Sequence, residues 1–145
     1  MLTLDYYPGS DVVDWAANIV ENNADCRVII NTHGLLNYDM TLLTDSAVTY
    51  MHENLITKFQ NIVMVVCGHH EADGPKYKIV TGQNGNKIVE MMINPQGIEK
   101  RNNEPYGFVA TMHFSNNGKT VEVEYFSTVR NAYYKQEYQF IFELE

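Results

Sequence analysis

Two histidines occupy equivalent places in this chain, each soon after a short apolar segment. His33 follows the segment Arg27–Asn31, and His69 follows the segment Ile62–Cys67. Neutral imidazole is the commonest protein ligand of transition metals. If the two segments form neighbouring parallel strands, both side chains emerge at the same carboxyl edge, where open α/β sheets bind their ligands. The spacing is compatible with a metal site, but two ordinary surface or loop histidines are the commoner interpretation of such a pair.

A second polar cluster begins directly after Cys67 and reads Gly68-His69-His70-Glu71. Gly68 lets the backbone approach closely where the strand ends. In an extended segment, residues two apart point to the same side. His69 and Glu71 are thus the better pair of ligands, while His70 points the other way. A polar loop that caps an apolar strand is the alternative interpretation.

The elements that must position these side chains alternate between strand and helix. Leu2–Tyr6, Arg27–Asn31 and Ile62–Cys67 read as strands. Apolar residues at helical spacing predict one helix after each of the first two strands, and Thr44 or Asp45 caps the second helix. Because Ile62–Cys67 shows no polar alternation, it suits a strand covered on both faces, as in a parallel sheet. This order predicts a β-α-β-α-β unit with parallel strands.

The chain changes character near Gly74-Pro75. Beyond it, Asn84-Gly85 and Asn117-Gly118 each stand between two segments rich in strand-forming residues. Asn-Gly accepts positive φ at both central positions of a turn, so both read as antiparallel hairpins. We therefore predict an α/β fold with an α/β half over residues 1–75 and an antiparallel β-rich portion over residues 76–145, packed together as one unit.

Several other side chains are expected in ordinary structural roles. Trp15 is expected to pack on a helix face, and His52 to be solvated. The two cysteines, Cys26 and Cys67, are expected to be buried free thiols. Four glutamates are expected on the solvent-exposed face of a sheet: Glu90, Glu122, Glu124 and Glu143.

Composition narrows the class of protein. The chain has 145 residues, of which 45% are hydrophobic and 19% charged, which is typical of one globular domain. Eighteen acidic against ten basic residues give a net charge of -8, which argues against a binder of duplex nucleic acid. The longest apolar run, Ile62–Cys67, is far shorter than the roughly 20 residues of a membrane span. No segment has the pattern of a signal peptide, and the sequence does not indicate a compartment.

Three segments together resemble the C-terminal half of the calcineurin-like metallophosphoesterase family. They are Asp14-Trp15-Ala16, Arg27–His33 with its Thr-His pair, and Asn61–His69 with its Gly-His pair. Met92–Gly97 resembles the strand that follows the Gly-His motif in the family. The resemblance covers residues 1 to about 97.

The resemblance implies a hydrolase that cleaves phosphomonoesters or phosphodiesters with water activated by two divalent metal ions (Mn, Fe or Zn). It implies that His33 is the histidine of the family's Thr-His motif and that His69 is the first histidine of its Gly-His-x-His motif. Both would be metal ligands. The second histidine of that motif falls on Glu71, whose carboxylate also ligates such metals, and the neighbouring His70 is the alternative.

The resemblance also implies that the metal site is incomplete. The family's N-terminal half brings Asp-x-His, Gly-Asp-x-x-Asp and Asn-His motifs, and this chain contains neither Asp-x-His nor Asn-His. We therefore expect the C-terminal portion of a phosphatase-like enzyme, inactive by itself, whose phosphoester substrate binds to the full-length protein. A half-sheet leaves an open strand edge, which predicts a homodimer or a missing N-terminal half as the partner.

A non-catalytic binding module is the competing interpretation. The chain contains ten tyrosines, several of them between Tyr125 and Tyr138. A sheet lined with tyrosines binds carbohydrate or a partner protein through ring stacking. In that case Tyr133 and Tyr134 are the side chains to test. No catalytic residue is assigned from the sequence.

Overall fold

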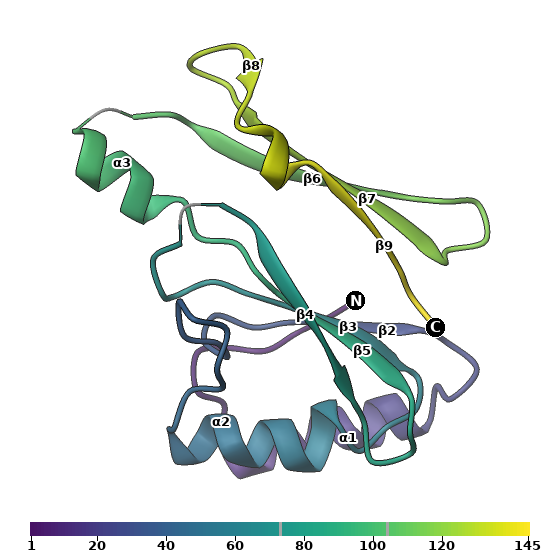
Figure 1. Ribbon diagram of the computed structural model, residues 1–145. Coiled ribbons are helices and arrows are strands. Elements are labelled where there is room, and N and C mark those ends of the chain that lie inside the picture. The colour runs from purple at the N-terminus through teal and green to yellow at the C-terminus, as the bar shows by residue number, and fades with distance from the viewer. Residues whose placement is uncertain (73, 104) are drawn as a thin grey trace.

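The computed structural model describes residues 1–145 except 73 and 104, and it has three layers (Figure 1). Helices α1 and α2 lie below a five-stranded sheet, and a four-stranded sheet lies above it. One sheet is largely parallel and the other is antiparallel. The α/β class predicted from the sequence is thereby confirmed.

The first sheet has the strand order β1-β2-β3-β5-β4. Its strands are β1 (Leu2–Thr3), β2 (Val28–Asn31), β3 (Ile62–Cys67), β4 (Lys76–Thr81) and β5 (Lys87–Met92). β1, β2, β3 and β5 run parallel, and β4 is antiparallel to β5. The carboxyl ends of the four parallel strands therefore meet at one edge.

The helices that cover the lower face are α1 (Ser10–Glu21), α2 (Ser46–Met51) and the π-helix η1 (His52–Ile56), which continues α2. The sequence leaves Thr44 and Asp45 open as the cap of the second helix. In the structure Asp45 is the cap, because its carboxylate accepts a hydrogen bond of 2.8 Å from the N–H of Ala47. Within the described residues, no helix combines the length and the apolarity that crossing a membrane requires.

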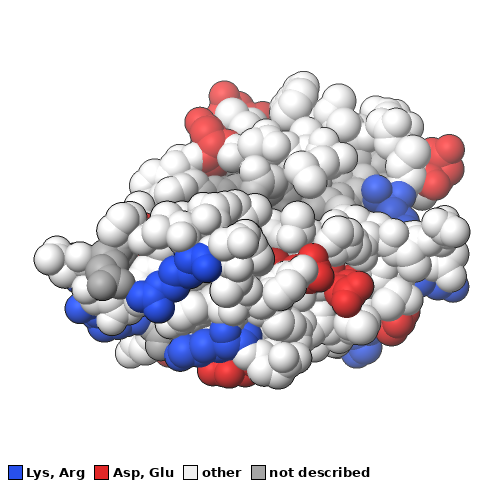
Figure 2. All heavy atoms as spheres, turned by 90° about the horizontal axis from the view of Figure 1, so that it is seen from above, with Lys and Arg blue, Asp and Glu red and all other residues white. Residues whose placement is uncertain are grey.

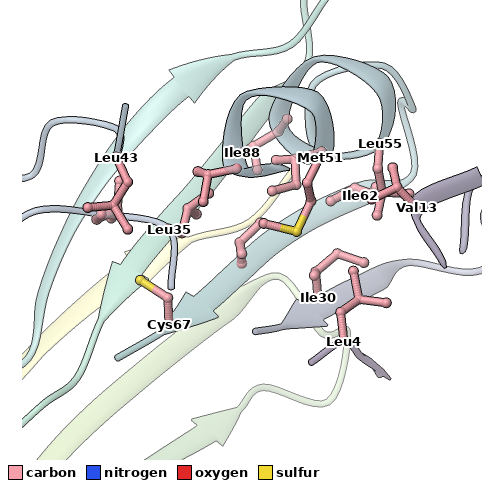
Figure 3. Close-up of a cluster of buried hydrophobic side chains, with 14 of the residues drawn as sticks. Leu4, Val13, Ile30, Leu35, Leu43, Met51, Leu55, Ile62, Cys67 and Ile88 are labelled. Atoms are coloured by element: carbon pink, nitrogen blue, oxygen red, sulfur yellow. The ribbon is translucent and has the colours of Figure 1, made fainter. Parts of the chain in front are cut away.

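The main core lies between these helices and the first sheet (Figure 3). Met51 and Leu55 from the helical layer meet Ile30 and Ile62 from the strands, and all four side chains are fully buried. Burying a large apolar side chain contributes about 1.5–3 kcal/mol relative to leaving it in water. This core therefore fixes the parallel strands, and with them the edge where they end.

The second sheet consists of β6 (Phe108–Phe114), β7 (Thr120–Ser127), β8 (Ala132–Tyr133) and β9 (Phe140–Glu143). The first two strands form the hairpin predicted at Asn117-Gly118. The short helix α3 (Gln96–Asn102) links the two sheets, and a 3-10 turn, η2 (Gln136–Tyr138), precedes β9. Neither α3 nor η2 is predicted by the sequence patterns.

A second core joins the two sheets face to face. Val121 and Val123 are fully buried there while Glu122 between them is exposed, as the alternation along the strand predicts. Met64 and Met91 of the first sheet pack against them. The hairpin β4–β5 belongs to the first sheet, so the change of character near residue 75 falls within a sheet and not between the two.

Four side chains depart from their expected surroundings. Trp15 is 52% exposed, so the prediction that it packs on a helix face is wrong. Glu90, expected on the solvent-exposed face of a sheet, is completely buried. His52, expected to be solvated, contacts Glu90, with 2.8 Å between His52 Nε2 and Glu90 Oε1. Cys26 is exposed, whereas Cys67 is buried as expected.

The two thiols should therefore differ sharply in reactivity. Burial raises the pKa of Cys67 to about 12, so its thiolate is scarce at neutral pH, and it is the thiolate that reacts. We expect one equivalent of Ellman's reagent to react with the folded protein and two with the unfolded protein. Changing Cys26→Ser should abolish the reaction of the folded protein. Rapid labelling of that variant would show that Cys67 is accessible.

Candidate metal site

Four neighbouring parallel strands each deliver one polar side chain to the carboxyl edge of the first sheet. Tyr6 follows β1, His33 follows β2, His69 follows β3 and Asn94 follows β5. His33, His69 and Asn94 each come two residues after the end of their strand. Because these strands are adjacent, equal spacing brings the side chains to the same place, where open α/β sheets bind ligands.

The two histidines singled out from the sequence are in contact. His69 Nδ1 lies 3.2 Å from His33 Nε2, and the ring centroids are 5.1 Å apart at an interplanar angle of 64°. The other ring nitrogen of His69, Nε2, lies 3.0 Å from Tyr6 Oη. Both nitrogens of His69 are thus engaged, one by His33 and one by Tyr6.

The backbone at His69 has an unusual conformation. Its φ of 66° lies in the left-handed region, which non-glycine residues seldom adopt. The N–H of His70 donates to the carbonyl oxygen of Gly68 at 2.9 Å, which closes a three-residue turn around His69. The buried Asn94 holds this turn, because its Nδ2 donates to the carbonyl oxygen of His69 at 2.9 Å. Such backbone conformations cost about 1–3 kcal/mol and cluster at functional sites.

The surroundings favour the neutral form of the His69 imidazole. Desolvation lowers the pKa of His69, and the charges of His70 and His33 act in the same direction. The neutral ring is the form that binds metal ions. A hollow of about 330 Å³ lies beside His33 and is also lined by Asn31, Gly68 and Ile93. The edge thus offers the neutral imidazole of His69 and, beside His33, space in front of the strands.

The separation of the two ring nitrogens fits one shared cation. With metal–nitrogen bonds of about 2.1 Å, two ligand nitrogens lie about 3.4 Å apart at a tetrahedral angle and about 3.0 Å apart at a right angle. The 3.2 Å between His69 Nδ1 and His33 Nε2 falls between these values. The same distance suits an N–H···N hydrogen bond, which is the form of the pair without a cation.

Glu71, the third ligand predicted from the sequence, lies elsewhere. Its side chain is 45% exposed, and its Oε1 is 3.7 Å from Lys100 Nζ on α3. The ring of His70 packs on that of His69 with 4.9 Å between centroids. Within the described residues, no three His, Cys, Asp or Glu side chains gather closely enough to hold a metal ion. The structure therefore brings two of the three predicted residues together, and the role of Glu71 stays a prediction.

Two members of the site, Tyr6 and Asn94, are not identified by the sequence analysis. Tyr6 is the last residue of the first predicted strand, whereas His33 lies two residues beyond the second, so the sequence does not present the two as equivalent. Asn94 offers no signal either, because it becomes a neighbour of His69 only once β5 pairs in parallel with β3. Pairing between strands so far apart in the chain is not encoded in any local pattern.

The tyrosines of the competing interpretation mostly pack on one another. Tyr125 and Tyr138 are buried, and Tyr134 stacks on Tyr138 at 6.1 Å between centroids. Tyr133 is different: it is 60% exposed, and its hydroxyl donates to Glu124 Oε1 at 3.1 Å. Tyr133 and Tyr134 therefore do not form one continuous stacking platform, and a binding role for them stays a prediction.

Comparison with known proteins identifies no relative of this chain. No protein-family model matches it, and neither does a curated protein or a solved structure. The arguments for a metal site are therefore the contact between His33 and His69, the strained turn that holds His69, and the position of both at the ends of parallel strands.

Proposed function

We propose that this chain is the C-terminal portion of a metal-dependent phosphoesterase. The observation that carries the proposal is the contact of 3.2 Å between His69 Nδ1 and His33 Nε2, which lie 36 residues apart in the chain. The resemblance of the sequence assigns these same two histidines as ligands on the basis of two separate motifs. Their meeting at the ends of β2 and β3 supports that assignment.

In this proposal His33 and His69 hold one divalent cation through their facing nitrogens. Tyr6 and Asn94 keep His69 in place, the first through the ring and the second through the backbone. Such a cation, when bound, activates water for attack on a phosphoester. Two imidazoles are fewer than the three protein ligands usual in catalytic zinc sites, so the isolated chain binds metal and phosphate without turning substrate over.

Phosphate binding in the presence and absence of metal tests this function. Isothermal titration calorimetry of the full chain should show inorganic phosphate binding at least tenfold more tightly with Mn²⁺ or Zn²⁺ present than without. Hydrolysis of bis(p-nitrophenyl) phosphate should stay at the level of the metal-only blank. Phosphate binding that does not depend on the metal would contradict the proposal, and clear turnover would show that a complete site exists.

Tyr6 provides a finer test of how His69 is held. Tyr6→Phe removes the hydroxyl next to His69 Nε2 but keeps the ring, which stacks on Tyr7 at 3.9 Å. We expect Zn²⁺ binding to weaken by about tenfold, since groups that orient a metal-binding histidine typically contribute that much or more. Tyr38→Phe, at a tyrosine that is 67% exposed, is the control and should leave affinity unchanged. Equal affinity in both variants would mean that Tyr6 does not position His69.

A further inference from the structure

The outer face of the second sheet, which points away from the first sheet, is not covered by any described element (Figure 1). We define the outer face by its apolar residues Val109, Phe126, Tyr133 and Ile141 and its acidic residues Glu122, Glu124 and Glu143. These positions alternate along β7 with buried residues, and along β6 and β9 mostly with half-buried or buried ones. The solvent-facing side of an antiparallel sheet is normally polar. A solvent-facing side that carries apolar residues is therefore a candidate for binding a partner.

Three of the four apolar residues of the outer face are exposed, and the fourth, Phe126, is half-buried. Val109, Phe126 and Tyr133 form one row across β6, β7 and β8, because each is the register partner of the next. Val109 is 46% exposed and Tyr133 is 60% exposed. Ile141, also 60% exposed, adds a second apolar position on β9. Grouped exposed apolar side chains mark interaction sites on soluble proteins.

Within the strands that form the outer face, the charged side chains are all acidic, and one histidine lies among them. The four strands β6 to β9 are all described, and they contain no Lys or Arg. Their carboxylates, Glu122, Glu124 and Glu143, all belong to the outer face. The nearest base is His113, whose Nε2 lies 3.1 Å from Glu124 Oε2. Figure 2 looks down on this side of the molecule and shows acidic atoms near the middle of the view, with basic atoms toward its left and right.

We propose that the outer face binds an amphipathic helix of a partner protein, with an apolar stripe flanked by Lys and Arg. The stripe covers Tyr133 and Ile141, which pair with Phe126 and Glu122 of β7. The basic flank lies over Glu122 and Glu124, which are beside the stripe on β7. A helix suits the site because the opposite side of the molecule is completed in the same way, with α1 and α2 lying on the first sheet.

Charge disfavours a second copy of this chain as the occupant of the outer face. A twofold dimer through this surface would bring the same patch of each copy together, and with it two sets of the same three carboxylates. Like charges placed opposite one another are destabilising, and the chain as a whole has a net charge of -8. A basic partner gains attraction from the same groups.

The test uses the full chain and two synthetic helical peptides of about 18 residues, a length that gives about five turns. Both peptides have Leu at positions i, i+3, i+4 and i+7, and one has Lys where the other has Glu. Fluorescence anisotropy should show the Lys peptide binding at least tenfold more tightly than the Glu peptide. The difference should shrink at high salt, because screening weakens exposed charge pairs. Equal binding of the two peptides, or no binding of either, overturns the proposal.

Variants locate the binding surface. Ile141→Asn should weaken binding of the Lys peptide by about tenfold, since one exposed apolar contact is lost. Ile79→Asn is the matched control, because Ile79 is 54% exposed on β4 of the other sheet. Combined Glu122→Gln and Glu124→Gln changes should remove the preference for Lys over Glu, without disturbing the core. An equal effect of both isoleucine variants, or a dimer in light scattering that Ile141→Asn dissolves, would contradict a basic helical partner.

Discussion

Replacing either His33 or His69 with Ala is expected to weaken binding of Zn²⁺ or Mn²⁺ by more than about 100-fold, because even the groups behind a ligand contribute 10–100-fold. In the proposed site the nitrogens of the two rings, 3.2 Å apart, hold one ion. Each single variant should therefore lose the same equivalent of bound metal that the double variant loses. If the two rings serve different ions, each single variant instead keeps one equivalent of metal, and only the double variant loses both.

Three further variants separate the histidine pair from its neighbours. His113→Ala, on β6 next to Glu124, should leave metal affinity unchanged. His70→Ala should have a small effect, because His70 touches His69 only through ring packing. Glu71→Gln should change affinity by less than threefold or so, since Glu71 is turned toward Lys100. A large loss in Glu71→Gln would show that this carboxylate turns back as the third ligand, as the resemblance implies. Equal metal binding by the wild type and the double histidine variant would show that neither His33 nor His69 is a metal ligand.

Segments with clear local signals were the most predictable part of the fold. β3 has the bounds expected from the sequence, Ile62–Cys67, and β6 and β7 form the hairpin expected at Asn117-Gly118. Both are marked by residues that favour strands and by clear turn signals at their ends, so local chemistry determines them. The helix α3 has no comparable local signal, because it is short. It ends at Asn103 in the left-handed conformation, which asparagine can adopt but which its presence does not predict.

Residues that act through distant partners were the least predictable. Glu90 lies on a strand between Val89 and Met91, and alternation alone makes it a solvent-facing position. The opposite face of that strand is instead covered by the helical layer, so Glu90 is buried with His52 and Lys78. Trp15 shows the reverse error, since a large aromatic residue on an amphipathic helix remains 52% exposed. Both errors have one cause: which face of an element is covered depends on contacts between segments remote in the chain.

Replacing Glu90 with Ala is expected to lower the free energy of unfolding by about 3 kcal/mol, as removing one partner of a buried ion pair typically does. His52 Nε2 donates to Glu90 Oε1 at 2.8 Å, and Lys78 Nζ lies 3.2 Å from Oε2. Both partners lose the carboxylate that they contact in the native protein. The side chains of His52 and Lys78 are 20% and 31% exposed, so they regain some water, which keeps the loss at the lower end of the usual range. Urea unfolding measures it, with Glu122→Ala on the exposed face of β7 as the control.

The pH dependence distinguishes the charge of Glu90 from its packing. Desolvation acts to raise the pKa of Glu90, but the hydrogen bond from His52 and the charges of His52 and Lys78 outweigh it, so the pKa is lowered. The unfolded chain then binds a proton that the folded protein does not, and stability increases with pH in that range. The contribution is complete above the ordinary glutamate value of about 4.3 and is lost as pH falls through the lower value of the folded protein. Glu90→Gln keeps the shape and should lack this part of the acid profile. A Glu90→Gln profile parallel to that of the wild type would mean that Glu90 is buried in its neutral form, and that His52 and Lys78 contribute by packing alone.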